Sequence, residues 1–72
     1  MPRPPHRQIL GETIRSHRRH AAWSQEFLAE KADLSAKYLG EVERGYVNIS
    51  VDALVRIAKA LRLRVRDLTQ GF

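Results

Sequence analysis

The chain is 72 residues long, contains no cysteine, and carries 13 lysines and arginines against 8 aspartates and glutamates, for a formal net charge of +5. This length allows one small domain whose core a second copy would help to stabilise, and the missing cysteines exclude disulfides and thiolate metal sites. The apolar runs are too short to cross a membrane and no signal peptide precedes them, so we expect a cytoplasmic protein. The positive net charge suits an anionic partner. Nucleic acid is the first candidate, followed by an acidic protein or a membrane surface.

The N-terminal segment is rich in proline and arginine. Its first seven residues, MPRPPHR, hold all three prolines of the chain and two arginines. This composition predicts an extended or flexible arm over residues 1–7, followed by a single domain over residues 8–72. Apolar residues then recur at helical spacing, beginning with Leu10 and Ile14, which predicts a first helix from Gln8 to Ala21.

Two short helices follow in close succession. Ser24 is a good N-cap and predicts a helix over residues 25–32, because its hydroxyl can accept from backbone N–H groups of the first turn. The stretch ADLS interrupts the pattern. Ser35 then offers a second N-cap for a helix that runs to about Arg44, where Gly45 supplies a left-handed stop.

The C-terminal third contains the clearest helical pattern. Ser50 caps a helix whose apolar stripe has spacing i, i+3, i+4, i+7, at Leu54, Ile57, Ala58 and Leu61. A last short helix is predicted from Val65 to Thr69. No alternation typical of strands is present, so the sequence predicts an all-α fold of five helices.

The pair of short helices joined by about four residues predicts a helix-turn-helix. The chain resembles the lambda-repressor-like, Xre-type helix-turn-helix family, because SQEFLAEKADLS, LGEVERG, NIS and LVRIAKAL match its pattern in order and spacing between residues 10 and 68. This resemblance implies a compact five-helix domain that binds double-stranded DNA in a sequence-specific way and regulates transcription, with no enzymatic activity, cofactor, metal or small-molecule ligand. The small size and the NIS step are also similar to the controller proteins of restriction-modification systems, which bind DNA as homodimers.

The resemblance implies which residues read bases on the second helix of the motif: Ala36, Lys37, Tyr38 and Glu41. Lys37 can donate to guanine O6 or N7, and Glu41 can accept from the N4 amino group of cytosine. Ala36 offers only a methyl contact, suited to thymine. Tyr38 could touch DNA or could simply cover its neighbours.

The family also implies positions that hold phosphates, at Gln25, Ser35, Arg44, Tyr46 and Asn48. Gln25, at the start of the first helix of the motif, is further expected to buttress the reading helix. Arg18 and Glu43 are expected to form a buried or half-buried bridge between the first helix and the end of the reading helix, rather than to contact DNA.

The C-terminal region carries more apolar residues than a short helix needs for itself. The family implies a homodimer seam in this region, with candidates Leu61, Leu63, Val65 and Phe72. The rival interpretation places them in the core, which is favoured for Leu61. The arginines of RLRVR are interpreted as a solvated face, and together with the apolar tail they leave open an alternative function as an antitoxin or adaptor whose main partner is a protein.

A few residues invite other interpretations. His17 and His20 could share a metal, but a third ligand is lacking, so a partly buried imidazole is the better interpretation of His17. Trp23 is expected to cover the first two helices. Ala22 and Arg62 stand where the family prefers glycine, and Arg64 replaces the usual cap of the last helix. These departures affect the ends of the first and fourth helices and the length of the last one, not the helix-turn-helix.

Overall fold

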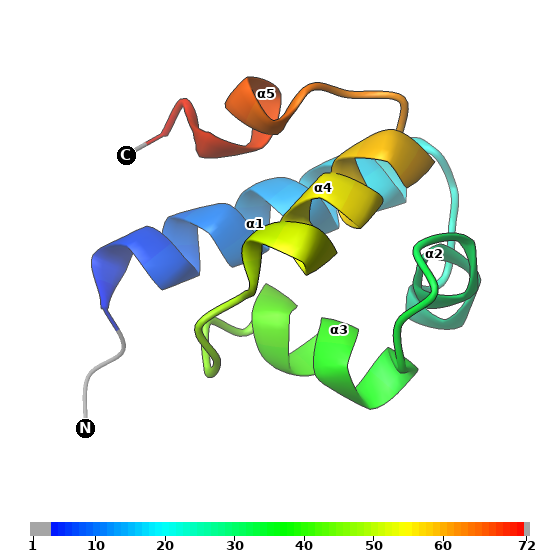
Figure 1. Cartoon of the computed structure of the whole chain (residues 1–72), viewed down its shortest axis with the longest axis horizontal. Coiled ribbons are helices and arrows are strands. Elements are labelled where there is room, and N and C mark those ends of the chain that lie inside the picture. Colours follow the sequence, from blue (N-terminus) through cyan, green and yellow to red (C-terminus); the bar gives the residue numbers. More distant parts are fainter. Residues whose placement is uncertain (1–3, 72) are drawn as a thin grey trace.

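The computed structural model describes residues 4–71, and within them the chain forms five α helices and no strand (Figure 1). The all-α, five-helix prediction is therefore confirmed. The helices are α1 (Pro5–His20), α2 (Gln25–Lys31), α3 (Ala36–Glu43), α4 (Val51–Ala60) and α5 (Val65–Thr69).

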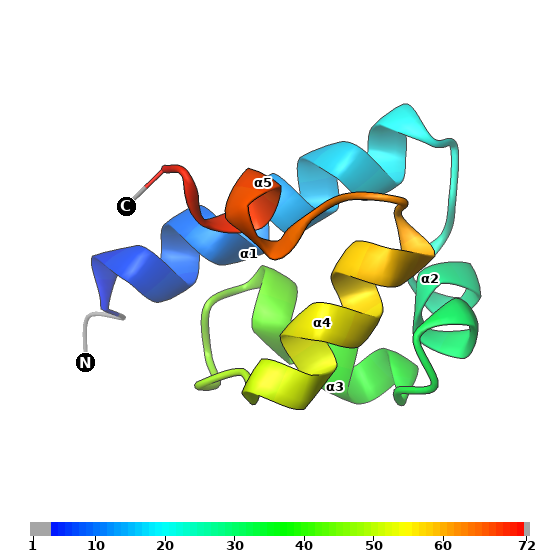
Figure 2. The ribbon, with the colours of Figure 1, turned by 45° about the horizontal axis from the view of Figure 1, so that its top comes forward.

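The helices enclose one core to which each contributes a large apolar side chain. α1 packs on α3 and α5, α2 packs on α3 and α4, and α4 packs on α5. Figure 2 shows α5 lying across α1, with α3 on the opposite side of the molecule. One side chain from each helix has no exposed surface: Ile14, Leu28, Leu39, Ile57 and Leu68. Burying such side chains is the main stabilising term of a domain this small.

The first helix begins earlier than the sequence predicts. A flexible arm over residues 1–7 is wrong for residues 5–7, which belong to α1, while residues 1–3 lie outside the described part of the chain. Pro5 takes the first helical position, where its fixed φ suits the helix and its missing N–H would have had no partner. The N–H groups of Arg7 and Gln8 both donate to the carbonyl of Pro4, at 3.0 and 3.3 Å.

The predicted caps set the starts of the middle helices. The hydroxyls of Ser24, Ser35 and Ser50 each accept a hydrogen bond from the backbone N–H three residues later, at 3.0, 3.0 and 3.1 Å. α5 starts without such a hydroxyl. There the Asp67 carboxylate accepts from the backbone N–H of Arg64 at 2.8 Å, so an acidic side chain in the first turn holds the residue that precedes the helix, although no side-chain hydroxyl caps the first turn.

Two residues that replace glycine in the family adopt left-handed backbone. Ala22 has φ of 61° and Arg62 has φ of 58°, each just after a helix. A side chain in this region costs more than glycine does, because Cβ approaches the backbone too closely. Both helices thus end at a left-handed residue that carries a side chain, at some cost in stability.

We expect Ala22→Gly and Arg62→Gly each to raise the free energy of unfolding by about 0.5–1 kcal/mol. Urea denaturation followed by circular dichroism measures this change. Ala21→Gly is the matched control, because Ala21 has an ordinary φ of −80° and glycine there only adds freedom to the unfolded chain. An equal gain from all three variants would contradict the assignment of strain.

Candidate nucleic-acid interface

The second helix of the motif, α3, buries one side and leaves the other open. Leu39 and Val42 face the core, Lys37 is exposed, and Ala36 and Glu41 are half-buried. In Figure 1, α3 lies along the lower edge with no helix beneath it. A side chain on this outer face can therefore reach a ligand that approaches from below.

Gly40 does not face solvent, although the helical spacing places it on the outer side of α3. It is buried because neighbouring side chains cover it: a Cβ at this position would lie 3.4 Å from Oε1 of Gln25 and 3.5 Å from a guanidinium nitrogen of Arg44. The side chains of Gln25 and Arg44 thus cover the middle of the outer face.

Tyr38 is half-buried and packs against the core cluster. Its hydroxyl accepts a hydrogen bond from the backbone N–H of Ser50 at 3.3 Å. The side chain therefore joins α3 to the start of α4. No feature of the sequence around Tyr38 or Ser50 points to this contact, since 12 residues separate them.

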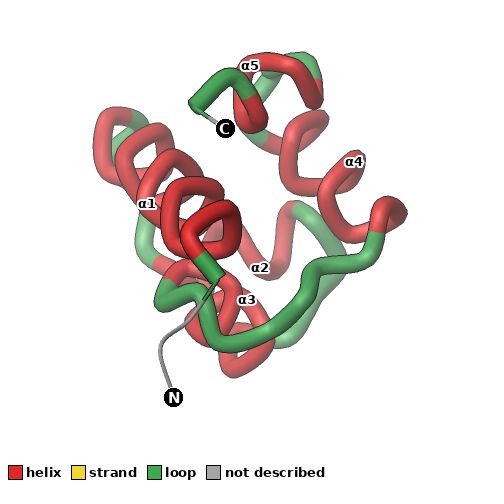
Figure 3. Tube along the Cα trace, turned by 90° about the vertical axis from the view of Figure 1, so that its left-hand side faces the viewer, coloured by secondary structure: helices red, strands yellow, loops and turns green. Residues whose placement is uncertain are grey.

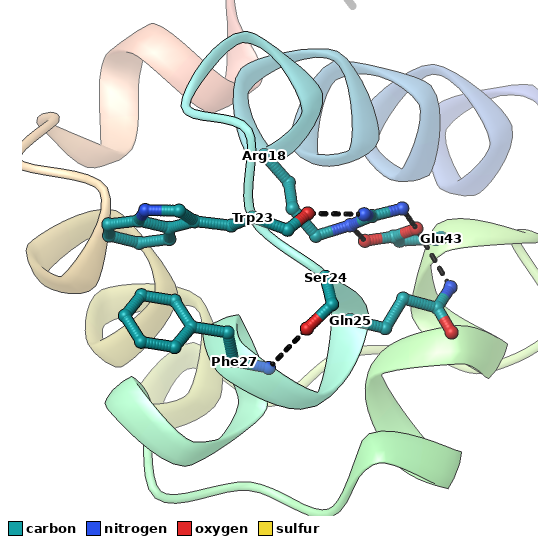
Figure 4. A network of polar contacts seen from close by, with 6 residues as sticks. All are labelled: Arg18, Trp23, Ser24, Gln25, Phe27 and Glu43. Carbon is teal, nitrogen blue, oxygen red and sulfur yellow. Dashed lines mark hydrogen bonds and ion pairs between the residues drawn. The ribbon is translucent and has the colours of Figure 1, made fainter.

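The expected bridge between α1 and α3 forms between Arg18 and Glu43 and is buried (Figure 4). Nε of Arg18 donates to Oε2 of Glu43 at 2.7 Å, and Nη2 of Arg18 donates to Oε1 at 3.0 Å. Arg18 is 8% exposed and Glu43 is 2% exposed. This two-pronged geometry is the one in which an arginine holds a carboxylate most firmly.

Two further hydrogen bonds connect the bridge to α2. Nη1 of Arg18 donates to the carbonyl of Trp23 at 2.8 Å, and Nε2 of Gln25 donates to Oε1 of Glu43 at 3.0 Å (Figure 4). The hydrogen bonds that Arg18 donates to Glu43 raise the pKa of Arg18 above its ordinary value, against the lowering effect of burial. The guanidinium therefore stays charged at any accessible pH, and the network fixes α3 against α1 and α2.

The structure places Gln25 as a support for α3. Its amide nitrogen is committed to Glu43 and its oxygen lies beside Gly40. The side chain is half-buried. The buttressing expected of this residue is thus visible as a contact, whereas a phosphate contact stays a prediction.

The remaining phosphate candidates lie at both ends of α3. Ser35 is exposed at the start, with its hydroxyl accepting the Tyr38 N–H. Arg44 is exposed at the end, its guanidinium 5.4 Å from the ring centroid of Tyr46, which is itself 55% exposed. Asn48 is exposed in the segment that joins α3 to α4, which crosses the front of the molecule in Figure 3.

The sequence gives no sign that the start of α1 lies at this same surface. Gly45, with φ of +76°, packs so closely on α1 that a Cβ would lie 3.1 Å from the backbone nitrogen of Gln8 and 3.3 Å from the carbonyl carbon of Arg7. Nε of Arg7 is buried without a hydrogen-bond acceptor within residues 4–71. Arg7 is thus a further basic group beside the segment that carries Tyr46 and Asn48.

Other candidates lie away from α3. Leu61, Leu63 and Val65 are half-buried and pack against the core cluster, and Phe72 lies outside the described residues. His17 is half-buried and His20 is exposed, and no group of three or more His, Asp and Glu side chains within residues 4–71 is arranged to hold a metal. None of the described helices combines the length and apolar character needed to cross a bilayer.

The five helices pack into one domain, and two of them form a capped helix-turn-helix whose second helix has an open outer face. This arrangement defines a DNA-binding domain of the helix-turn-helix class. A profile of the helix-turn-helix family matches residues 14–68, and the chain belongs to that family. Control protein C.SmaI of Serratia marcescens is 42% identical over 62 residues, which cover 86% of this chain and 74% of the relative.

Solved structures agree with this assignment. The restriction-modification controller protein C.AhdI from Aeromonas hydrophila superposes with a TM-score of 0.85 at 35% identity, over 86% of this chain and 94% of that one. The master regulator for biofilm formation SinR, solved in complex with DNA, superposes with a TM-score of 0.78 at 32% identity, over 82% of this chain and 95% of that one. The family is one of DNA-binding transcriptional regulators, and these relatives are named as control proteins and regulators rather than as enzymes.

Proposed function

We propose that this protein is a sequence-specific transcriptional regulator that places α3 in the major groove of double-stranded DNA and acts as a homodimer. The observation that carries the proposal is the outer face of α3, where Lys37 is exposed beside half-buried Glu41 and the helix is held from behind by the bridge of Arg18 and Glu43. A rigid helix of this kind can keep a few side chains at fixed positions against base edges.

The chemistry of the outer face favours G·C pairs. Lys37 supplies a donor for guanine O6 or N7, and Glu41 supplies an acceptor for cytosine N4. Glu41 also repels phosphate, so it weakens binding to any sequence that offers it no amino group. Ala36 adds a small apolar contact at the start of the helix. Tyr38 is the weakest of the four candidates, because its hydroxyl already accepts from Ser50.

Phosphate contacts would set the register of α3 without choosing sequence. Arg44, Tyr46 and Asn48 lie after the end of α3 and Ser35 lies at its start. Gln25, at the start of α2, contacts the C-terminal half of α3. Arg7 joins the first group through the close packing of α1 on Gly45. Groups at both ends of one helix can hold the two phosphate backbones that border a groove.

The size of the domain suits a two-fold arrangement on DNA. The described residues measure 30 × 24 × 22 Å, and half-sites one helical turn apart are separated by about 34 Å. Two copies of this size joined side by side can span that distance, and we propose Leu61, Leu63, Val65 and Phe72 as the seam between them. Such a dimer requires a pseudo-palindromic operator.

Selection of bound duplexes from random DNA tests the proposal directly. Two half-sites of inverted sequence, about one turn apart, are the expected result. Enrichment of no sequence would defeat the assignment of a specific regulator. Enrichment of a single, non-repeated site would support base reading by α3 but would contradict the homodimer.

The roles of Lys37 and Arg44 should separate on mutation. Lys37→Ala should relax the preference at one base pair by about 1–3 kcal/mol. Arg44→Ala should weaken binding to all sequences and reduce the salt slope by about one unit. Both are measured by titrating the selected duplex and a random duplex at several salt concentrations.

Lys59→Ala is the matched control for these variants, because Lys59 is an exposed lysine of α4 away from α3. It should leave base preference unchanged. Equal losses on selected and random duplex for Lys37→Ala would contradict base reading by this residue.

The proposed seam should respond to salt in the opposite sense to DNA binding. Exposed Arg62, Arg64 and Arg66 alternate with the apolar candidates Leu63 and Val65, so two copies repel each other until salt screens the arginines. Added salt should thus strengthen dimerisation in sedimentation experiments while it weakens DNA binding. A monomer at micromolar concentration and on DNA would reject the dimer.

A further inference from the structure

A groove lies where the ends of α1, α2 and α4 meet. It is on the side of the α1–α2 linker away from Arg18 and Glu43 (Figure 4). Its floor includes Trp23, Ala60 and Leu61, its rim includes Lys31 and Arg62, and its volume is about 270 Å³. A second hollow of about 290 Å³ shares Lys31 and Ala60 with the first. We call these two adjoining hollows the α2–α4 groove. No residue of α3 lines either of them.

The rim of the α2–α4 groove is positively charged. Lys31, Arg56, Lys59 and Arg62 line it and are exposed, against one acid, Asp33. Asp33 is already engaged by Arg56, whose guanidinium donates to the Asp33 carbonyl at 3.1 Å and lies 4.0 Å from its carboxylate. Within residues 4–71 the other three cations make no ion pair. A ligand with carboxylates would thus meet unneutralised charge.

The groove also offers apolar surface. Trp23 is half-buried, and the ring of Phe27 meets it edge-on with centroids 4.9 Å apart. Phe27 is 41% exposed, and Nζ of Lys31 lies 5.3 Å from its ring centroid. Figure 4 shows both rings on the side of the linker away from Arg18 and Glu43. Exposed aromatic rings bordered by cations are typical of protein interaction sites.

We infer that the α2–α4 groove binds an acidic segment of a partner protein that carries apolar side chains. The apolar side chains would pack on Trp23 and Phe27 while carboxylates meet Lys31 and Lys59, which leaves the seam candidate Leu61 to a second copy. The groove borders the proposed seam at Leu61, but the charges of Lys31 and Lys59, unpaired within residues 4–71, favour an acidic segment over a second copy, whose net charge is +5. DNA fits poorly as well, because its phosphate backbone has nothing to place against an apolar floor. The inference goes beyond DNA binding and does not depend on it.

The test begins with a random peptide library displayed against the full chain. The library is counter-selected on the variant Lys31→Gln/Lys59→Gln, which keeps the fold but removes two rim charges. Peptides rich in Asp and Glu with interspersed Leu, Phe or Trp are the expected result. Recovery of basic or neutral peptides, or of no peptide that distinguishes the two proteins, would overturn the inference.

One selected peptide is then titrated against the fluorescence of Trp23, the single tryptophan of the chain. Lys31→Gln/Lys59→Gln should weaken binding about tenfold. The matched control is Arg19→Gln/Arg66→Gln, which removes the same charge at exposed positions outside the groove and should change affinity less than about twofold. Equal weakening by the two pairs, or an unchanged Trp23 signal on binding, would overturn the inference.

Competition separates the other occupants. Random duplex DNA should not displace the peptide, and the peptide should not change the sedimentation of the protein toward monomer. Displacement by duplex would show that the groove takes nucleic acid, and dissociation of dimers would show that it takes a second copy; either overturns the inference. Duplex binding is measured on the same protein preparation. If the peptide does not bind but the duplex does, the groove inference fails and the proposed DNA-binding function stands.

Discussion

Replacing Glu43 with alanine is expected to lower the free energy of unfolding by about 3–5 kcal/mol. The cause is the stranded partner: Arg18 is 8% exposed and cannot lose its proton at any accessible pH. Its Nε and Nη2 would be left without their acceptors. Because a domain of this size is stable by only a few kcal/mol, the variant should be largely unfolded at physiological temperature. Urea denaturation at low temperature, followed by Trp23 fluorescence, measures the loss.

Two further variants distinguish a stranded charge from a lost contact. Arg18→Met/Glu43→Leu removes both charges and should recover most of the stability, because well-packed apolar side chains can replace a buried ion pair. Gln25→Ala removes one hydrogen bond to Glu43 and should cost about 1 kcal/mol. A loss below about 1 kcal/mol for Glu43→Ala would mean that water reaches Arg18 and that the bridge does not fix α3.

Local features of the sequence predict the helix starts well. Ser24, Ser35 and Ser50 each cap a helix as expected, because the hydroxyl and the N–H that it accepts are only three residues apart. The last helix runs from Val65 to Thr69 as predicted, although it has no capping hydroxyl and the Asp67 carboxylate instead accepts from the backbone N–H of Arg64. The start of α1 is the exception. There the proline-rich composition indicated an arm. Proline is well tolerated in the first turn of a helix, however, and α1 begins at Pro5.

The candidate site depends more on contacts between distant segments, and these are harder to predict. The resemblance placed Arg18 opposite Glu43, across 25 residues, and no spacing rule within one helix could have done so. The cover over Gly40 and the contact of Tyr38 with Ser50 each depend on how two helices pack, so the sequence alone put Gly40 outside and left Tyr38 undecided. Helical spacing predicts which face a residue takes, but side chains of neighbouring helices decide whether that face is open.

Gly11→Ala should have an effect comparable to the loss of Glu43, by a different mechanism. A Cβ at residue 11 would lie 2.4 Å from the carbonyl oxygen of Val42 and 2.5 Å from that of Glu43. Both are backbone atoms in the last turn of α3, so no side-chain rotation can relieve the clash. We expect a loss of about 3 kcal/mol, at the upper end of overpacking effects, even though alanine is the better helix former by about 1 kcal/mol.

Gly40→Ala is the matched control for Gly11→Ala, because it also changes a buried helical glycine but would place Cβ no closer than 3.4 Å to a side-chain atom. It should be neutral or stabilising by up to about 1 kcal/mol. Gly11 and Arg18 are two turns apart on the same side of α1, so lifting α1 away from α3 would also stretch the bridge to Glu43. Equal stability of the two alanine variants under urea would mean that α1 and α3 can separate without loss, and the close backbone approach at Gly11 would then have no part in holding α3 in place.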